Sequence, residues 1–146
     1  MKKLIIAFIA IPLVFWGIPM AVCETQTYLH GSEFDGLQGQ TRMIGDVDYW
    51  KVMSYSSESA TVYYVKEDGG GSTVAFSKQG DAWVLDRWDT IWSRTGSADD
   101  FIWPYFYHSP EGLALYVFFL IPLYLLAFGI LFIVSVVRKN RLHRLR

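Results

Sequence analysis

Two long stretches of this chain carry no charged side chain, and they constrain its fold more than any other feature. They cover residues 4–22 and 113–137 and lie on either side of a polar middle. A helix rises about 1.5 Å per residue and the hydrocarbon core of a bilayer is about 30 Å thick, so roughly 20 residues can cross it. Both stretches are close to this length or longer, and we therefore predict two transmembrane helices that flank one polar region.

Charged residues outside these stretches are distributed unevenly. Residues 23–112 contain all 14 acidic side chains but only six of the 13 basic ones, which gives this middle region a net charge of −8. The other seven basic side chains lie in residues 1–3 and 138–146. Because basic residues are retained on the cytoplasmic side of a membrane, we predict that both ends are cytoplasmic and that residues 23–112 are exported. We interpret the basic tail as a topology signal that attracts anionic lipid, not as a nucleic-acid site.

The first apolar stretch also fits a second interpretation. A short basic start, an apolar run and small residues are typical of a secretory signal peptide, and Ala21 and Cys23 offer a poor cleavage site. Cys23 is also a candidate for lipidation, although Val22 is bulkier than the small residue that usually precedes such a cysteine. We carry forward the uncleaved anchor as the prediction. Cleavage near Cys23 would leave a single-pass protein.

The cysteine and asparagine content bears on the compartment. Cys23 is the only cysteine, so no disulfide can form within one chain. Asn140 is the only asparagine, and the residues that follow it do not complete a glycosylation signal. Both observations fit a protein of the bacterial inner membrane, in contact with the lipid bilayer, whose middle region lies outside the cytoplasm.

From residue 47 onward, the exported region changes to short runs of aromatic and β-branched residues that turn signals separate. We predict four strands, over residues 47–55, 59–66, 72–78 and 82–92. Short connections favour an antiparallel meander. The predicted fold class is therefore a membrane-anchored α+β protein, with two transmembrane helices around a small β-meander. We expect the core of the meander to include Val62, Val74, Phe76, Trp83 and Leu85.

The residues that precede the strands, 24–46, are polar and contain four closely spaced glycines. Glycine favours turns and weakens the interiors of helices and strands. We therefore predict mostly loop here, with at most one short helix or edge strand around residues 28–29 or 37–43. The apolar face of the sheet must be covered. We consider as covers its own tryptophans, residues 28–34 and the membrane surface.

Side chains that could perform chemistry form no recognisable motif. His30, Glu33 and Asp35 lie within six residues of one another, but a closed zinc site needs four nitrogen or sulfur ligands, usually in paired spacing. His108 and Ser109 lie near the predicted membrane surface and lack the GxSxG sequence of a nucleophile elbow. We therefore predict no catalytic residue, no metal site and no cofactor.

The segment from residue 88 to residue 103 is the strongest candidate for an interaction surface. It combines tryptophans with an arginine and several carboxylates, and interface hot spots favour tryptophan and arginine. The candidate residues are Trp88, Asp89, Trp92, Arg94, Asp99, Asp100 and Trp103. The alternative is that the tryptophans form the core, while Asp99 and Asp100 cap turns.

The predicted function is binding of a protein partner, itself another membrane or envelope protein, by a small exported domain without enzymatic activity. An accessory subunit of a membrane complex and an exclusion or immunity factor fit the sequence equally well. The alternative is a membrane-anchored hydrolase or metal-dependent enzyme that uses the carboxylates between Asp86 and Asp100. The apolar stretches contain no charged residue of the kind that marks ion or proton pathways, which argues against a transporter acting alone.

Overall fold

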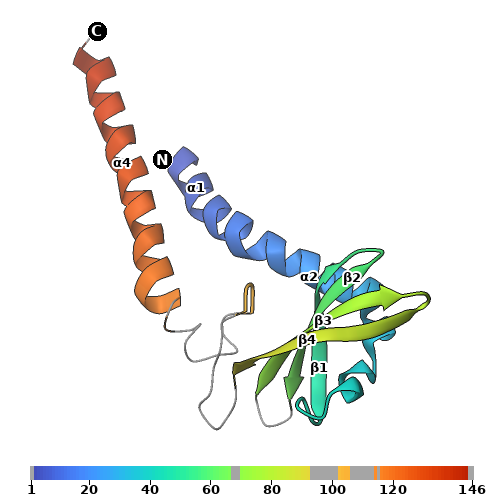
Figure 1. Cartoon of the computed structure of the whole chain (residues 1–146). Coiled ribbons are helices and arrows are strands. Elements are labelled where there is room, and N and C mark those ends of the chain that lie inside the picture. Colours follow the sequence, from blue (N-terminus) through green and yellow to red (C-terminus); the bar gives the residue numbers. More distant parts are fainter. Residues whose placement is uncertain (1, 67–69, 93–101, 106–113, 115, 145–146) are drawn as a thin grey trace. The chain divides into compact units, whose positions relative to one another are not determined.

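A computed structural model describes residues 2–66, 70–92, 102–105, 114 and 116–144 of the chain. The chain divides into two compact units (Figure 1). One unit combines Met1–Ile18 with Ala114–Arg146, and the other is Pro19–Leu113. The first unit is helical, and the second is built around a β-sheet.

Helices long and apolar enough to cross a membrane make up the first unit. Its elements, with the helix that continues into the second unit, are α1 (Lys2–Pro12), the π-helical turn η1 (Leu13–Gly17), α2 (Ile18–His30), the π-helical turn η5 (Tyr116–Leu120) and α4 (Ile121–Arg144). In the part of the chain that the structure describes, two helical segments, Ile5–Phe34 and Val117–Arg138, have the length and composition of membrane spans. The expected pair of long apolar helices is therefore present.

Each of these π-helical turns lies beside a proline. Pro12 directly precedes η1, and Pro122 is the second residue of α4, which follows η5. Proline has no backbone N–H, and its ring crowds the carbonyl four residues earlier, so it interrupts the regular hydrogen-bond ladder. A local π-helical adjustment can satisfy the freed backbone groups. The irregular turns are therefore consequences of the two prolines.

Within the helical unit, α1 and α4 are in contact through aromatic side chains. The ring of Phe8 lies 5.4 Å from that of Tyr124 and 5.3 Å from that of Phe128, measured between centroids. The hydroxyl of Tyr124 donates a hydrogen bond to the carbonyl of Phe8 at 2.6 Å. Packing and interhelical hydrogen bonds of this kind hold helices together in lipid, where the hydrophobic effect contributes little.

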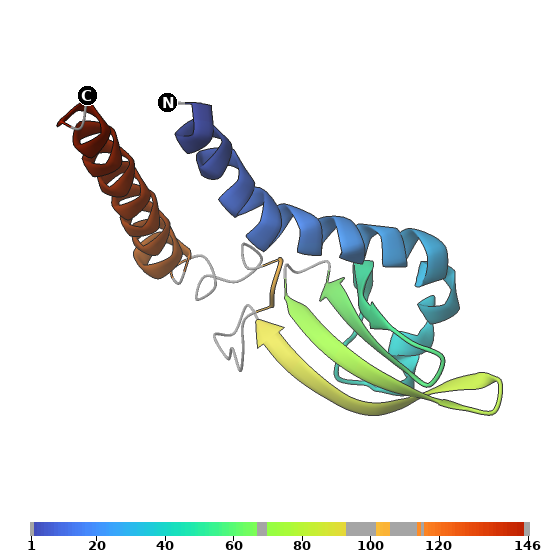
Figure 2. The ribbon, with the colours of Figure 1, turned by 90° about the horizontal axis from the view of Figure 1, so that it is seen from above.

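The described strands of the second unit form a four-stranded antiparallel sheet in the order β1-β2-β3-β4 (Figure 2). They are β1 (Val47–Tyr55), β2 (Ser59–Lys66), β3 (Gly71–Gln79) and β4 (Ala82–Trp92). Each strand pairs with the next one along the chain, so the predicted meander is confirmed. Three of the four predicted strands have the same bounds as in the structure, and β3 is one residue longer at each end.

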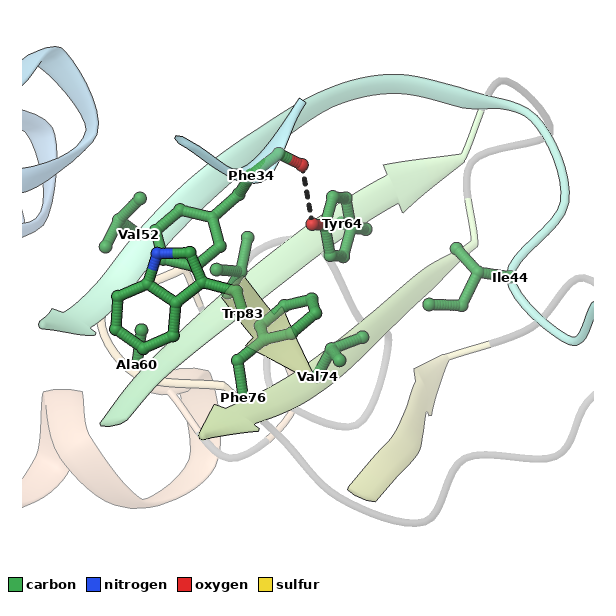
Figure 3. Packing of buried hydrophobic residues seen from close by; sticks show 9 residues of the cluster. Phe34, Ile44, Val52, Ala60, Tyr64, Val74, Phe76 and Trp83 are labelled. Atoms are coloured by element: carbon green, nitrogen blue, oxygen red, sulfur yellow. Dashed lines mark hydrogen bonds between the residues drawn. The ribbon is translucent and has the colours of Figure 1, made fainter. Parts of the chain in front are cut away.

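One face of the sheet carries the larger hydrophobic cluster (Figure 3). Its buried members are Phe34, Ile44, Val52, Ala60, Val62, Tyr64, Val74, Phe76 and Trp83. The first two come from the segment before β1, which contains the 3₁₀ turns η2 (Gly31–Phe34) and η3 (Leu37–Gln40). The buried hydroxyl of Tyr64 donates to the carbonyl of Phe34 at 2.9 Å and fixes this segment on the sheet. Of the five predicted core residues, four are buried, and Leu85 is partly buried against the same cluster.

A second cluster covers the opposite face. Cys23 of α2 packs there with Tyr63, Val65 and Ile91 of the sheet and with Ile102 and Tyr105. Tyr105 also donates its hydroxyl to one carboxylate oxygen of Glu24 at 2.9 Å. The other carboxylate oxygen of Glu24 is paired with the Lys51 ammonium at 2.7 Å. The residues after the first apolar stretch and the residues before the second therefore meet on one face of the sheet.

The prediction of mostly loop for residues 24–46 is wrong in its first part. Helix α2 continues to His30, and the 3₁₀ turns η2 and η3 follow it. Helical stability in proteins comes mainly from tertiary packing, and Cys23 and Thr27 of this helix contact the sheet. The four glycines that suggested a loop begin at Gly31, immediately after the helix ends. They mark its end and the turns beyond it, not its absence.

Candidate functional site at the open edge of the sheet

The outer strands of an open sheet expose backbone N–H and C=O groups that no neighbouring strand pairs, and such edges are ready to pair with another chain. Among the described strands, β1 and β4 are the outer ones. Side chains from the segment before β1 reach both edges, but they cover them to different extents.

Helix α2 closes the β1 edge. The hydroxyl oxygen of Thr27 accepts a hydrogen bond from the N–H of Val52 at 2.8 Å, and the hydroxyl donates to the carbonyl of Cys23 at 2.7 Å. Nearby, the indole N–H of Trp50 donates to the carbonyl of Gly31 at 2.9 Å. An outward donor of β1 is thus satisfied by a helix side chain, and the helix itself occupies the place of a further strand.

A single glutamine covers the beginning of the β4 edge. The amide nitrogen of Gln40 donates to the carbonyl of Trp83 at 2.9 Å, and its amide oxygen accepts from the N–H of Leu85 at 2.8 Å. A side-chain amide supplies one kind of donor and one acceptor, so Gln40 reproduces the two hydrogen bonds that a neighbouring strand would make. These bonds also show that the backbone groups of Trp83 and Leu85 point away from β3.

A β-bulge follows directly. Leu85 and Arg87 pair with consecutive residues of β3, which leaves Asp86 as the extra residue. A bulge shifts the alternation of side chains by one residue. Trp88 therefore lies on the same face as Leu85 and packs against the larger cluster, whereas Ile91 belongs to the opposite cluster. Strict alternation from Leu85 would have placed Trp88 on the wrong face.

Beyond the bulge, the edge of β4 is open. Residues on one face of a strand share the direction of their backbone groups. Because Trp83 and Leu85 point outward, Trp88 and Thr90 on the same face also direct their N–H and C=O groups away from β3. Within the part of the chain that the structure describes, nothing hydrogen-bonds to these outward groups. Here the guanidinium of Arg87 is paired with the carboxylate of Asp89 at 2.9 Å, and their side chains are 77% and 42% exposed.

The predicted interaction surface is only partly described. Trp88 and Asp89 lie on the open edge, and Trp92 is the last residue of β4. Trp103 is half-buried in the segment that contributes to the second cluster. Arg94, Asp99 and Asp100 lie outside the described residues. Trp88 is partly buried against the core, so it has a share in the alternative interpretation as well.

Arg87, Thr90 and Gln40 are site residues that the sequence analysis did not include. The signal for the first two was present, because opposite charges alternate around a tryptophan in the run Asp86–Thr90. What the sequence did not show is that this run lies on an outer strand beyond the reach of Gln40. No local pattern marks Gln40, which lies 45 residues before the backbone N–H that it caps.

Glu33 forms the most connected polar cluster of the second unit. Its carboxylate accepts hydrogen bonds from His30 Nδ1 at 2.8 Å, from the Tyr55 hydroxyl at 3.1 Å and from the Trp83 indole N–H at 3.0 Å. The His30 ring also stacks on Tyr55, with 3.6 Å between centroids. Desolvation alone would raise the pKa of Glu33, but the hydrogen bonds from Trp83, His30 and Tyr55 outweigh it and hold the pKa below its ordinary value. A carboxylate so engaged is a poor proton donor at neutral pH, and we interpret it as a brace that holds η2 on the sheet.

The other groups considered for chemistry are engaged separately. Asp86 accepts a hydrogen bond from the Ser77 hydroxyl at 2.8 Å, and Asp89 is held by Arg87. Over the described residues, no three His, Cys, Asp or Glu side chains gather closely enough to hold a metal ion. His108 and Ser109 lie outside the described residues.

Comparison with protein-family models, with curated proteins and with solved structures gives no match to this chain. The functional argument therefore depends on the geometry of the site. Of the features described above, the open edge of β4 is the one that calls for a binding partner.

Proposed function

We propose that this protein is a non-enzymatic membrane protein whose exported β unit binds a protein partner through the open edge of β4. The observation that carries the proposal is the contrast between the covered and uncovered parts of the sheet edges. Thr27 and Gln40 satisfy outward backbone groups on β1 and on the first part of β4. An extended segment of a partner can add a strand to the remaining part, where main-chain hydrogen bonds supply affinity and side chains supply specificity.

The location of the partner follows from the proposed topology. Two apolar helices of sufficient length support insertion in a membrane, and the basic ends around an acidic middle support cytoplasmic termini with residues 23–112 exported from a bacterial inner membrane. The partner is then another membrane or envelope protein at the same surface. Reporter fusions test this topology directly. A fusion after residue 146 should be active in the cytoplasm, a fusion near residue 70 should be active outside it, and the reverse result would contradict the topology.

Two roles fit this arrangement. The protein is an accessory subunit that holds a membrane complex together, or it is an exclusion or immunity factor that occupies an incoming macromolecule. Both need a firmly anchored binding edge and no reaction centre.

Substitution of Thr90 tests whether the edge is used. Its N–H points outward, so Thr90→Pro removes a donor that an added strand needs without removing a bond of the β3 ladder. Thr90→Val is the matched control, because it keeps the N–H and changes only the side chain. We expect the proline variant, but not the valine variant, to lose the protein partners that co-purify with the full-length chain from membranes in mild detergent. Equal recovery of partners with both variants, each still protease-resistant, would contradict the proposal.

A further inference from the structure

The charges around the open edge of β4 are arranged symmetrically. Asp86, Arg87, Trp88, Asp89 and Thr90 follow one another, so that a positive and a negative side chain flank one tryptophan. We infer that the strand added to this edge is β4 of a second copy of this chain, paired antiparallel about Trp88. This inference rests on the proposed function, since it names the partner for the same edge.

Charge complementarity selects this partner. In an antiparallel pair centred on Trp88, Arg87 of each copy lies directly opposite Asp89 of the other. Opposite charges at directly opposed positions stabilise a sheet, and like charges destabilise it. The Arg87 side chain is 77% exposed and carries five N–H donors, so it can contact the second copy's carboxylate while it remains near Asp89 of its own chain.

The same charges exclude the neighbouring registers. Moving the centre of symmetry to residue 87 places two arginines opposite each other, and moving it to residue 89 does the same with two aspartates. Both alternatives bring like charges together and leave no compensating pair. The register of the strand pair is therefore set by Arg87 and Asp89, and not by backbone hydrogen bonds, which any register could form.

Backbone direction and the tryptophan agree with this register. The outward N–H and C=O of Trp88 form the central hydrogen-bonded pair with the same groups of the second copy. The two Trp88 side chains then lie side by side on one face, where each is already partly buried against its own core. Cross-strand aromatic pairs add to sheet stability. The Arg87–Asp89 contacts form on the other face.

The closed β1 edge limits the assembly to two copies. Strand addition could continue without end if both edges of the sheet were free. Here α2 occupies the β1 edge through Thr27 and Val52, so the only edge left for pairing, among the described strands, is that of β4. One self-complementary edge makes a closed twofold dimer and not a filament.

Charge-reversed variants test the pairing between copies. Arg87→Asp places aspartates opposite aspartates in a dimer, and Asp89→Arg places arginines opposite arginines. We expect each variant alone to show at least about a tenfold weaker self-association, because juxtaposed like charges cost several kcal/mol. Mixed together, the two variants restore both opposite-charge contacts between copies. The mixture should therefore recover association to about the level of the unmodified protein.

The measurement uses full-length chains reconstituted in neutral liposomes, with energy transfer between donor-labelled and acceptor-labelled copies as the readout. Recovery in the mixture cannot come from repair of either fold, since each chain in it keeps its own substitution. Thr90→Pro serves as the control for use of the edge. If the charge-reversed variants associate like the unmodified protein, or if the mixture fails to recover, the self-pairing inference is overturned.

A second readout separates this failure from failure of the proposed function. The same variants are purified from membranes, and heterologous proteins that co-purify are quantified. Loss of such proteins with Thr90→Pro, together with unchanged self-association of the charge variants, would retain the edge as a binding site and reject the second copy as its occupant. No effect of Thr90→Pro on either readout would reject both.

Discussion

The two edges of the sheet expose the same backbone groups and yet differ in their surroundings. At β1, a helix lies along the strand and Thr27 satisfies the N–H of Val52. At β4, one side chain, Gln40, satisfies Trp83 and Leu85, and the described part of the chain provides no cover from Trp88 to Thr90. The difference teaches that the segment before β1 protects most of the sheet from pairing and leaves one short self-complementary run available.

Chain connectivity explains where the protection ends. The segment that follows α2 must cross the larger core cluster before it enters β1, and it places Phe34 and Ile44 on that face. Gln40 lies between these two anchors and reaches the hairpin end of β4. The bulge at Asp86 comes next. A bulge disrupts the ladder and bends the strand, so it separates a covered half of β4 from an open half.

The largest expected effect distinguishes the two halves of β4 by their tryptophans. Trp83 is buried, with 7% of its surface exposed, and its indole donates to Glu33, whereas Trp88 is only partly buried. We expect Trp83→Ala to lower the free energy of unfolding by about 3–5 kcal/mol, and Trp88→Ala to lower it by clearly less. Denaturant titration of the full-length protein in detergent, followed by circular dichroism of the sheet, measures both values. Equal losses would mean that the open half contributes to the core as much as the covered half.

The β1 edge can be broken by an isosteric substitution. Thr27→Val removes the acceptor for the N–H of Val52 and leaves a part-buried donor unsatisfied. We expect a loss of about 1–3 kcal/mol in unfolding free energy. Thr25→Val is the matched control, because Thr25 is exposed and its hydroxyl makes the same kind of bond, to the carbonyl of Ala21 within the helix. A comparable loss in both variants would show that helix propensity, and not edge coverage, explains the effect.

The cover at β4 is expected to be worth less, since Gln40 itself is exposed. Gln40→Met should lower the unfolding free energy by about 0.5–1.5 kcal/mol and speed amide hydrogen exchange at Leu85, whose N–H loses its acceptor. Gln38→Met is the control, because the side-chain oxygen of Gln38 is buried without a hydrogen-bond partner. Unchanged exchange at Leu85 in the Gln40 variant would contradict the assigned role of Gln40.

Acidification should loosen the covering segment by the smallest amount. The pKa of Glu33 is lower in the folded protein than in the unfolded chain. The stabilisation is therefore fully present above the unfolded-state pKa and is lost as the pH falls through the folded-state pKa. Glu33 is one-third exposed, and solvent screening keeps the effect modest. Denaturant titrations between pH 7 and pH 3 should show a steeper loss of stability for the unmodified protein than for Glu33→Gln. Equal pH dependence would exclude Glu33 as the source.

Regular elements of the fold were largely predictable. The alternation of apolar residues located β1, β2 and β4 with their bounds, because a strand's period of two depends only on the order of its own residues. The same pattern placed Ala60, Val62 and Tyr64 together on the face that carries the larger cluster. The site was less predictable. Trp88 and Asp89 were included among its residues, but the reason for their importance, an edge without cover, is not a property of a single strand.

The sequence by itself determined that the chain has two long apolar helices around one polar region, and that this region contains a four-stranded meander with an aromatic core. These features follow from composition and period within short windows of the chain. Only the tertiary structure decided that α2 extends to His30, that Asp86 forms a bulge and that Gln40 stops short of Trp88. The reason is physical, since the edge contacts join groups 25 to 45 residues apart. Such contacts depend on how the elements pack against one another, which no local pattern of residues specifies.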